Sequence, residues 1–423
     1  MKEMRLRHLA QVNPSAPAFD RLSADEDVTF LPMESVWPGS GLDISQHRKK
    51  SSVASGYTRF QDGDVLVPKI TPTFEAGRAV LVDGLCNGTG AGTTELHVLR
   101  AGAGLDSRFL LYCMSSYHFL KKGEAEMYGV AGQKRVPDEF IRDFPVVLFS
   151  LEEQRRIADF LDAETARIGR MVEVARRLRD VLHERLEAQN AWFLRGAHIS
   201  GERSVHPVLG ELPDAWRALS LRRVIPRIGV GVVVDPSSYF AEDGVPFIRG
   251  SNVRPGGFDL DGVRFISELD SKKLCRSRLS EGDVVVVRAG YPGRAAVVPS
   301  ELDGANCASI LVLKKGKFLR SKFLEYYFNG PLGETYVSSV RYGAAQEQIN
   351  VSHVVDFMIP VPSLVEQDSI LKELGGHSAA VSEMDGLLSR QIALLAERRQ
   401  DLITAAVTGQ IEVATASGRG IEG

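Results

Sequence analysis

The stretch FPVVLFSLEEQRRIADFL, residues 144–161, decides how the chain is organised, and a related stretch returns as FMIPVPSLVEQDSILKEL, residues 357–374. Each copy has a short apolar run, then Ser-Leu, then a charged segment with Glu-Gln, and then a long helical pattern. The two Glu-Gln pairs lie about half a chain length apart. A repeat of this length indicates a duplicated domain rather than a solenoid of short units.

Apolar residues in both helical patterns recur at steps of three, four or seven, which is typical of the narrow seam of a coiled coil. A helix of about 40 residues spans roughly 60 Å, which is too long for burial in one ordinary domain. We therefore expect the two helices to pair with each other, although a long surface helix on a larger core would give a similar pattern. The predicted seam residues are Ile157, Leu161, Ile168, Val172, Ala175, Leu178, Leu182, Val381, Met384, Leu388, Ile392, Leu395 and Leu402.

Two glycines, Gly375 and Gly376, interrupt the second helical pattern. Together they cost roughly 2 kcal/mol of helix propensity. We therefore expect a kink, a late start or a bend in the second helix.

Length and composition are those of an ordinary globular chain. The 423 residues suffice for about two to four domains. The 51 Lys and Arg residues nearly balance the 54 Asp and Glu residues, so net charge does not indicate a nucleic-acid partner, although a basic face can be offset by an acidic one elsewhere. Four scattered cysteines, no signal peptide and no apolar run of roughly 18 to 20 residues predict a cytoplasmic protein without a membrane span.

The segments that precede the two helices also repeat each other in order. Residues 63–69 read GDVLVPK and residues 282–288 read GDVVVVR, each a strand opened by a Gly-Asp turn. A short helix candidate follows in each half, at residues 109–117 and 323–328. The expected organisation is a mixed domain at 1–150, a long helix at 151–197, a second mixed domain at 198–363 with a linker at 198–208, a long helix at 364–410 and a disordered tail at 411–423.

The sequence lacks the motifs of catalysis that we sought. It has no phosphate-cradling Gly-x4-Gly-Lys-Ser/Thr loop, no Asn/Asp-Pro-Pro-aromatic motif of adenine methyltransferases and no His-Glu-x-x-His. The glycine-rich residues 88–92 read as a flexible loop, and Asp64 and Asp283 as turn residues at strand starts. We therefore expect that the chain is not an enzyme by itself and binds neither a cofactor nor a metal.

Polar and cationic residues follow both Gly-Asp-Val strands and recur in a second loop before each long helix. Lys and Arg can donate to guanine edges or phosphates, Thr to either, and Gln and Asn suit adenine. Each of these residues could equally belong to a solvated loop, but their recurrence at matching places favours a recognition role. The candidate DNA-binding residues are Lys69, Thr71, Thr73, Arg78, Gln133, Lys134 and Arg135 in the first half, and Arg288, Tyr291, Arg294, Gln346, Gln348 and Asn350 in the second.

The chain resembles the specificity subunits of Type I restriction–modification systems over nearly its whole length. The resemblance lies in the two helix starts, 150–158 and 363–370, in the closing segment 397–410, in the Gly-Asp-Val strands and in the Gly-x-x-Gln loops before the helices. No one of these motifs is unique to the family, but their order, spacing and duplication together are specific.

The resemblance implies an α+β fold in which two mixed α/β target recognition domains are separated by two long helices. These helices would pair as an antiparallel coiled coil, with an internal pseudo-two-fold duplication. Each domain would read one half of a bipartite target on double-stranded DNA, while the helices fix the spacer and dock two methylation subunits. Motor–nuclease restriction subunits would join them, and the partner subunits would bind S-adenosylmethionine, ATP and Mg.

Two other functions compete with this interpretation. One is a protein-binding coiled-coil scaffold without DNA contact, which would show no salt-dependent affinity for DNA. The other is a self-contained methyltransferase or nuclease, against which the missing cofactor motifs count.

Overall fold

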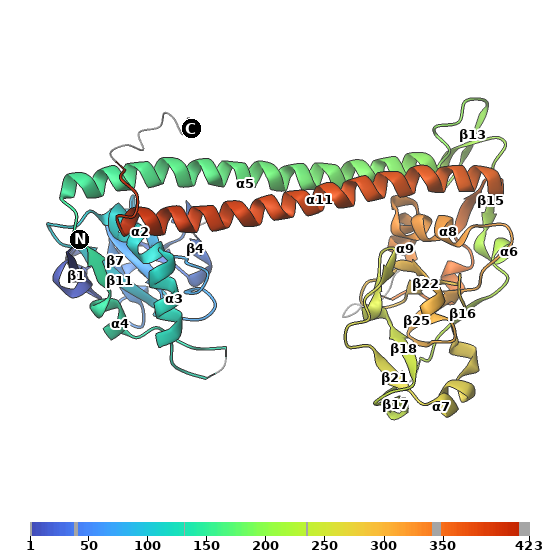
Figure 1. Cartoon of the computed structure of the whole chain (residues 1–423), viewed down its shortest axis with the longest axis horizontal. Coiled ribbons are helices and arrows are strands. Elements are labelled where there is room, and N and C mark those ends of the chain that lie inside the picture. The colour runs from blue at the N-terminus through green and yellow to red at the C-terminus, as the bar shows by residue number, and fades with distance from the viewer. Residues whose placement is uncertain (1, 38–40, 131, 234–235, 341–347, 414–423) are drawn as a thin grey trace. The chain divides into compact units, whose positions relative to one another are not determined.

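The computed structural model describes residues 2–37, 41–130, 132–233, 236–340 and 348–413. The chain divides into two compact units: Met1–Arg177 with Leu388–Gly423 form unit 1, and Leu178–Leu387 form unit 2. Two 44-residue helices, α5 (Leu151–Leu194) and α11 (Leu364–Val407), contribute to both units (Figure 1). The expected α+β fold, with two sheet-rich parts and two long helices, is confirmed.

Unit 1 contains two four-stranded sheets. The first has the order β6 (His47–Lys49), β3 (Asp27–Leu31), β10 (Thr89–Gly92), β7 (Thr58–Gln61), and the second β2 (Ala10–Val12), β11 (Leu96–Ala101), β8 (Asp64–Pro68), β9 (Val80–Leu81). Strands β3 and β10 run parallel, whereas the other neighbours are antiparallel. The shorter elements are β1 (Glu3–Arg5), α1 (Pro17–Arg21), β4 (Val36–Trp37), β5 (Gly41–Leu42), α2 (Ser107–Ser115), α3 (Tyr117–Glu126), α4 (Asp138–Asp143) and β12 (Pro145–Val147).

Unit 2 also contains two four-stranded sheets, and the second of them has the strand order of the second sheet of unit 1. Its sheets have the orders β17 (Phe240–Ala241), β21 (Arg264–Ile266), β18 (Val245–Arg249), β24 (Asn306–Ala308), and β16 (Ile228–Val230), β25 (Ile310–Leu313), β22 (Val284–Val287), β23 (Ala295–Val297). Again one pair, β18 with β24, runs parallel. The shorter elements are β13 (Arg203–His206), β14 (Gly210–Pro213), β15 (Arg217–Ser220), α6 (Leu221–Val224), β19 (Val253–Arg254), β20 (Gly257–Phe258), α7 (Glu268–Lys273), α8 (Ser321–Asn329), α9 (Pro331–Val340), α10 (Val351–Val354) and β26 (Met358–Val361).

The Ser-Leu-x-Glu-Gln segments start both long helices by the same chemistry. In the first, the Ser150 N–H donates to Glu153 Oε2 at 2.8 Å and the Glu153 N–H donates to Ser150 Oγ at 3.3 Å. In the second, Ser363 and Glu366 repeat the two bonds at 2.9 and 3.3 Å. This capping box satisfies backbone donors that no helical carbonyl can reach, so each helix begins directly after its serine.

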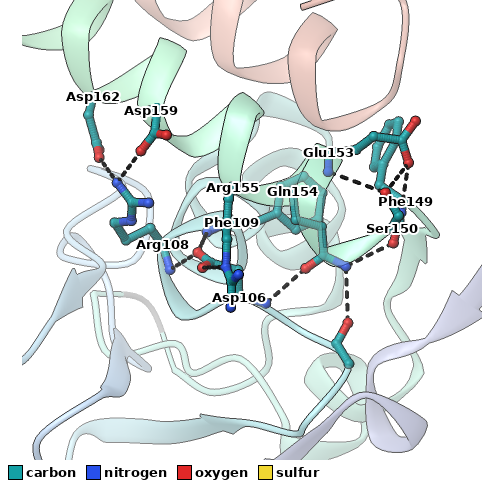
Figure 2. A network of polar contacts seen from close by, with 11 residues as sticks. Asp106, Arg108, Phe109, Phe149, Ser150, Glu153, Gln154, Arg155, Asp159 and Asp162 are labelled. Carbon is teal, nitrogen blue, oxygen red and sulfur yellow. Dashed lines mark hydrogen bonds and ion pairs between the residues drawn. The ribbon is translucent and has the colours of Figure 1, made fainter.

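The glutamine of each segment hydrogen-bonds the start of the long helix to the unit that precedes it in the chain. Gln154 is 2% exposed; its Nε2 donates to the carbonyls of Gly104 and Phe149, both at 3.0 Å, and its Oε1 accepts from the Asp106 N–H at 2.8 Å (Figure 2). Gln367 makes the same three bonds, to Phe318 O, Pro362 O and the Arg320 N–H. The repeated Glu-Gln pair is therefore a cap followed by a buried clamp.

The two long helices pair antiparallel within each unit. In unit 1, Ile157 and Leu161 of α5 share one core with Ile403 and Val407 of α11. In unit 2, Arg179 of α5 binds Asp385 at 2.6 Å, and the Phe193 ring lies 5.7 Å from the ring of His377. Within that unit, the later residue of α5 contacts the earlier residue of α11, so the two helices run antiparallel.

Most predicted seam residues face the partner helix, but two do not. Ile157, Leu161, Ile168, Ala175, Leu388 and Leu395 are buried, and Val172, Leu182, Val381, Ile392 and Leu402 are half-buried. Leu178 and Met384 are instead 43% and 42% exposed, because the seam passes through their neighbours Arg179 and Asp385. Steps of three and four along a helix allow either of two adjacent residues to occupy a seam position. At both places the prediction chose the apolar residue, whereas the polar one occupies the seam.

Two expectations, one about a helix start and one about a linker, need correction. Helix α11 starts at Leu364 and continues through Gly375 and Gly376, so the late start is wrong. Capping at Ser363 and burial of Ile370 and Leu374 in the unit 2 core outweigh the low propensity of the glycines. The expected linker at 198–208 contains β13, which pairs with β14 in a hairpin.

The expected boundaries at the ends of the helices extend slightly too far. Both helices end three residues before the predicted 197 and 410. At the chain end, Ile411 and Val413 of the expected tail pack against the unit 1 core, and residues 414–423 lie outside the described part.

Candidate nucleic-acid interface

In unit 1 the structure joins the two polar loops that the sequence separates by more than sixty residues. Lys69 directly follows strand β8, and its carbonyl accepts from the Val136 N–H at 2.9 Å. The Thr71 N–H donates to Lys134 O at 3.0 Å, and the Lys134 N–H donates to Thr71 Oγ1 at 2.9 Å. The candidates Lys69, Thr71, Gln133 and Lys134 therefore lie on one joined surface, with the last two exposed.

We call this backbone contact between the two polar loops of a unit the junction. Unit 2 forms the same junction with different side chains. Arg288 directly follows β22, and its carbonyl accepts from the Ile349 N–H at 3.0 Å. A further antiparallel bridge pairs Ala289 with Gln348. Asn350, at the N-cap of α10, is half-buried beside them. Gln346 lies outside the described residues.

Three of the candidate DNA-binding residues in unit 1 interact with other residues of the protein. Thr73 is 8% exposed and its hydroxyl donates to Ile70 O at 2.7 Å, so it closes the turn after β8. Arg135 binds Glu95 through two bonds of 2.9 and 2.8 Å, and these bonds hold the pKa of the Glu95 carboxyl below its usual range. Arg78 is half-buried and also has a partner within the protein. These three are less suited to DNA than their residue types suggest.

Two candidates in unit 2 form their own cluster. Tyr291 is 62% exposed, and the Arg294 guanidinium lies 3.8 Å from the centre of its ring. They line a hollow of about 460 Å³ together with Glu187 and Glu334. The two carboxylates make this hollow a poor place for a phosphate, so Tyr291 and Arg294 differ from Arg288 in their surroundings.

The sequence reasoning missed a buried histidine behind the unit 1 junction. His97 of β11 is fully buried; its Nε2 lies 3.1 Å from Val136 O and its Nδ1 lies 3.1 Å from Asp138 Oδ1. Burial lowers the pKa of His97 to about 4 and Lys69 adds to this, whereas Asp138 and the Val136 carbonyl oppose it. The lone histidine between Leu96 and Val98 of this strand was the signal that could have found it.

The two Gly-Asp turns are confirmed as structural. Asp64 is buried, accepts from the Gln61 N–H at 2.9 Å and binds Arg100 at 2.7 and 2.8 Å. Asp283 accepts from the Ser280 N–H and binds Lys314 at 2.6 Å. In both units this carboxylate is saturated by a turn and a cation, as a strand-starting residue requires.

Within the described ranges, no group of three or more His, Cys, Asp or Glu side chains is placed to hold a metal ion. Across the same ranges, no helix is both long and apolar enough to cross a membrane.

These features define a class of protein with a duplicated sheet-rich unit. Each copy is hydrogen-bonded to the start of a long helix through a buried glutamine, and each has two polar loops joined at the end of one strand. No known family profile matches the chain. Over 154 residues, 36% of the chain, it is 40% identical to the Type I restriction enzyme EcoAI specificity subunit from Escherichia coli. The chain spans about a quarter (26%) of the length of that curated relative.

Solved structures agree over almost the full length. A chain from work on complex assembly of the type I R-M system matches with a TM-score of 0.75 at 20% identity, covering 97% of this chain and 98% of that one. An HsdS subunit from Thermoanaerobacter tengcongensis matches with a TM-score of 0.55 at 19% identity, covering 97% of both. The chain thus resembles Type I specificity subunits in sequence and shares the fold of these structures.

Proposed function

We propose that this chain is the sequence-specific DNA recognition subunit of a Type I restriction–modification complex, with one half of a bipartite target read by each unit. The observation that carries the proposal is the repeated junction, in which the residue after the Gly-Asp-Val strand binds the second polar loop. In unit 1 this is Lys69 with Val136, and in unit 2 Arg288 with Ile349. One backbone frame presents two different sets of donors, as two different half-sites require.

The side chains at each junction suit contact with base edges and phosphates. Unit 1 offers Gln133 and Lys134, both exposed, beside Lys69. Unit 2 offers Arg288 with the amides of Gln348 and Asn350. Amide side chains can bind adenine in a bidentate manner, whereas cations bind guanine edges or phosphates.

We further propose that the helices dock the two methylation subunits. In unit 2, Leu178, Val181, Met384 and Leu387 are between 42% and 52% exposed. Each directly precedes a seam position, and on antiparallel helices such positions fall on one side of the pair. The result is an apolar strip that no described residue covers, which is typical of a protein interface.

The remaining parts of the proposal concern the partners. The chain is not an enzyme by itself; methylation subunits would bind S-adenosylmethionine, and motor–nuclease restriction subunits would use ATP and Mg. The paired helices would fix the spacer between the half-sites, and the complex would act in the cytoplasm.

Methylation mapping tests this function. Cells expressing the cognate methylation subunit would be mapped for methyladenine with and without this chain. We expect methylation at one bipartite motif that depends on the chain. An assembled complex that produces no chain-dependent methylation would contradict the proposal and favour a protein-binding scaffold.

A further inference from the structure

In unit 1, two side chains at the start of strand β11 hold the second polar loop. Glu95, directly before β11, binds Arg135 through two bonds of 2.9 and 2.8 Å. His97, two residues later, has its Nε2 at 3.1 Å from the Val136 carbonyl oxygen. The strand pairing already includes the first of them, because the Glu95 carbonyl accepts from the Lys69 N–H at 2.8 Å. Residues two apart in a strand share one face, so this face holds two consecutive loop residues.

The contact of His97 is buried and directional. A carbonyl oxygen only accepts, so the proton of the neutral ring lies on Nε2 and points at Val136. Burial lowers the pKa of His97 to about 4, so the ring is neutral at neutral pH. The Val136 N–H in turn donates to Lys69 O at 2.9 Å. Val136 is therefore held from two sides, and the exposed Gln133 and Lys134 stand shortly before this fixed point.

Unit 2 shows that the strand itself does not require a histidine at this place. The cation that binds the carboxylate of the Gly-Asp turn is Arg100 in unit 1 and Lys314 in unit 2. Three residues before it stand His97 in one unit and Leu311 in the other, opposite equivalent residues of the Gly-Asp-Val strands. Leu311 is fully buried, as His97 is. The duplicated frame thus accepts an apolar side chain where unit 1 has a hydrogen-bond donor.

The loop of unit 2 is held in another way. The residue that matches Glu95 is Ser309, which carries no charge, and the side chains of β25 are all apolar. The junction of unit 2 rests on backbone pairing, with the Ile349 N–H donating to Arg288 O at 3.0 Å and Ala289 bridged to Gln348. Support of the loop by side chains of the adjacent strand therefore belongs to unit 1.

We propose that Glu95 and His97 are positioning residues for the half-site read by unit 1, which they influence through Gln133 and Lys134. This inference rests on the proposed function and adds two residues that act from behind the contact surface. A bidentate contact with a base edge requires a side chain with a fixed origin, and hydrogen bonds behind the contacting residues supply it. The asymmetry predicts that only one half-site depends on such support.

The test uses the full chain in complex with its methylation subunits. Variants H97L, H97Q and E95A would be compared with Q154A, which removes buried hydrogen bonds elsewhere in unit 1. H97L introduces the residue that unit 2 has at this position, whereas H97Q keeps an Nε2 donor for Val136. Methylation mapping and binding to DNA with single-base changes measure the discrimination in each half-site.

We expect H97L and E95A to lower discrimination on the order of 10-fold in the half-site of unit 1 and to leave the other half-site unchanged. H97Q should regain most of the loss. Q154A should lower the melting temperature but keep the motif. Equal relaxation of both half-sites, or equal relaxation in Q154A, would mean a merely structural role and would overturn the inference.

A second measurement needs no DNA. Hydrogen exchange of the complex reports on the backbone N–H groups of residues 134–136, relative to those of the unit 1 core. We expect faster exchange there in H97L and E95A but not in Q154A. Faster exchange with an unchanged motif would overturn the inference, because the loop would then not need to be held. A parent complex that yields no motif at all would instead refute the proposed function, while the exchange data would still show whether the two residues hold the loop.

Discussion

The role of each cation in this chain depends on whether an acceptor lies beside it. Arg135 and Arg100 each face a carboxylate and hold strands and loops together. Arg249 and Arg288 face none among the described residues. Arg100, Arg249 and Arg288 lie at or next to strand ends, whereas Arg135 lies in the loop before α4. Which of them have a partner among the described residues is decided by long-range contacts.

His97 should make stability depend on pH. Its folded pKa of about 4 lies below the ordinary value of 6.5, so the unfolded chain takes up the proton first. The stabilisation is complete above about pH 6.5 and is lost as pH falls towards 4, by roughly 3 kcal/mol at most. Denaturant unfolding of the parent and of His97→Gln at pH 7 and pH 4.5 would measure it. The stability difference between the two proteins should shrink at low pH; a constant difference would contradict the burial argument.

Gln154 should matter far more for stability than its polar neighbours. Gln154→Ala leaves one backbone N–H and two carbonyls without their bonds, in a place that is 2% exposed. We expect a loss of about 2–4 kcal/mol in the free energy of unfolding. Thermal or denaturant unfolding would measure the loss. The control is Glu152→Ala on the exposed side of the same turn; an equal effect of both changes would show that the clamp is unimportant.

At the scale of elements, the long helices depend on their starts and on packing more than on composition. Each begins with a capping box and buries apolar residues in the unit whose last strand leads into it. The seam then continues through a polar pair, Arg179 with Asp385. A polar pair at a seam position can fix the register of a coiled coil, since other registers would separate the two charges.

The glycines of α11 offer a stabilising change. Both Gly375 and Gly376 are exposed, and an added Cβ would meet no atom within 4 Å at either position. Alanine has the higher helix propensity, so each Gly→Ala change should add about 0.5–1 kcal/mol to the free energy of unfolding. The melting temperatures of the single and double variants would test this. A loss of stability would mean that the glycines are needed where they stand.

At the scale of the whole molecule, one chain contains two units that have separate cores and the same strand order in one of their two sheets. Under the proposed function each unit carries its own half-site. Exchanging residues 1–150 for those of another specificity subunit should therefore change one half of the methylated motif and leave the other intact. Methylation mapping of the exchange gives the answer, with the parent chain as control. A change in both halves would contradict independent reading.

The repeated Ser-Leu-x-Glu-Gln segments, the Gly-Asp-Val strands and the apolar periodicity were enough to predict the duplication, the two long helices and the strands before them. These features are local: caps, turns and periodic burial are set by residues a few positions apart. For the same reason the two polar loops could be found from the sequence, and most of the helix seam with them.

Only the tertiary structure showed which polar side chains are hydrogen-bonded within the protein and which are not. Thr73 and Arg135 are used inside unit 1, and His97 lies behind its junction. The same holds for Arg179 and Asp385, which replace Leu178 and Met384 at the seam. A hydrogen bond or ion pair between distant segments leaves no local pattern, because it depends on where the chain brings its partners together.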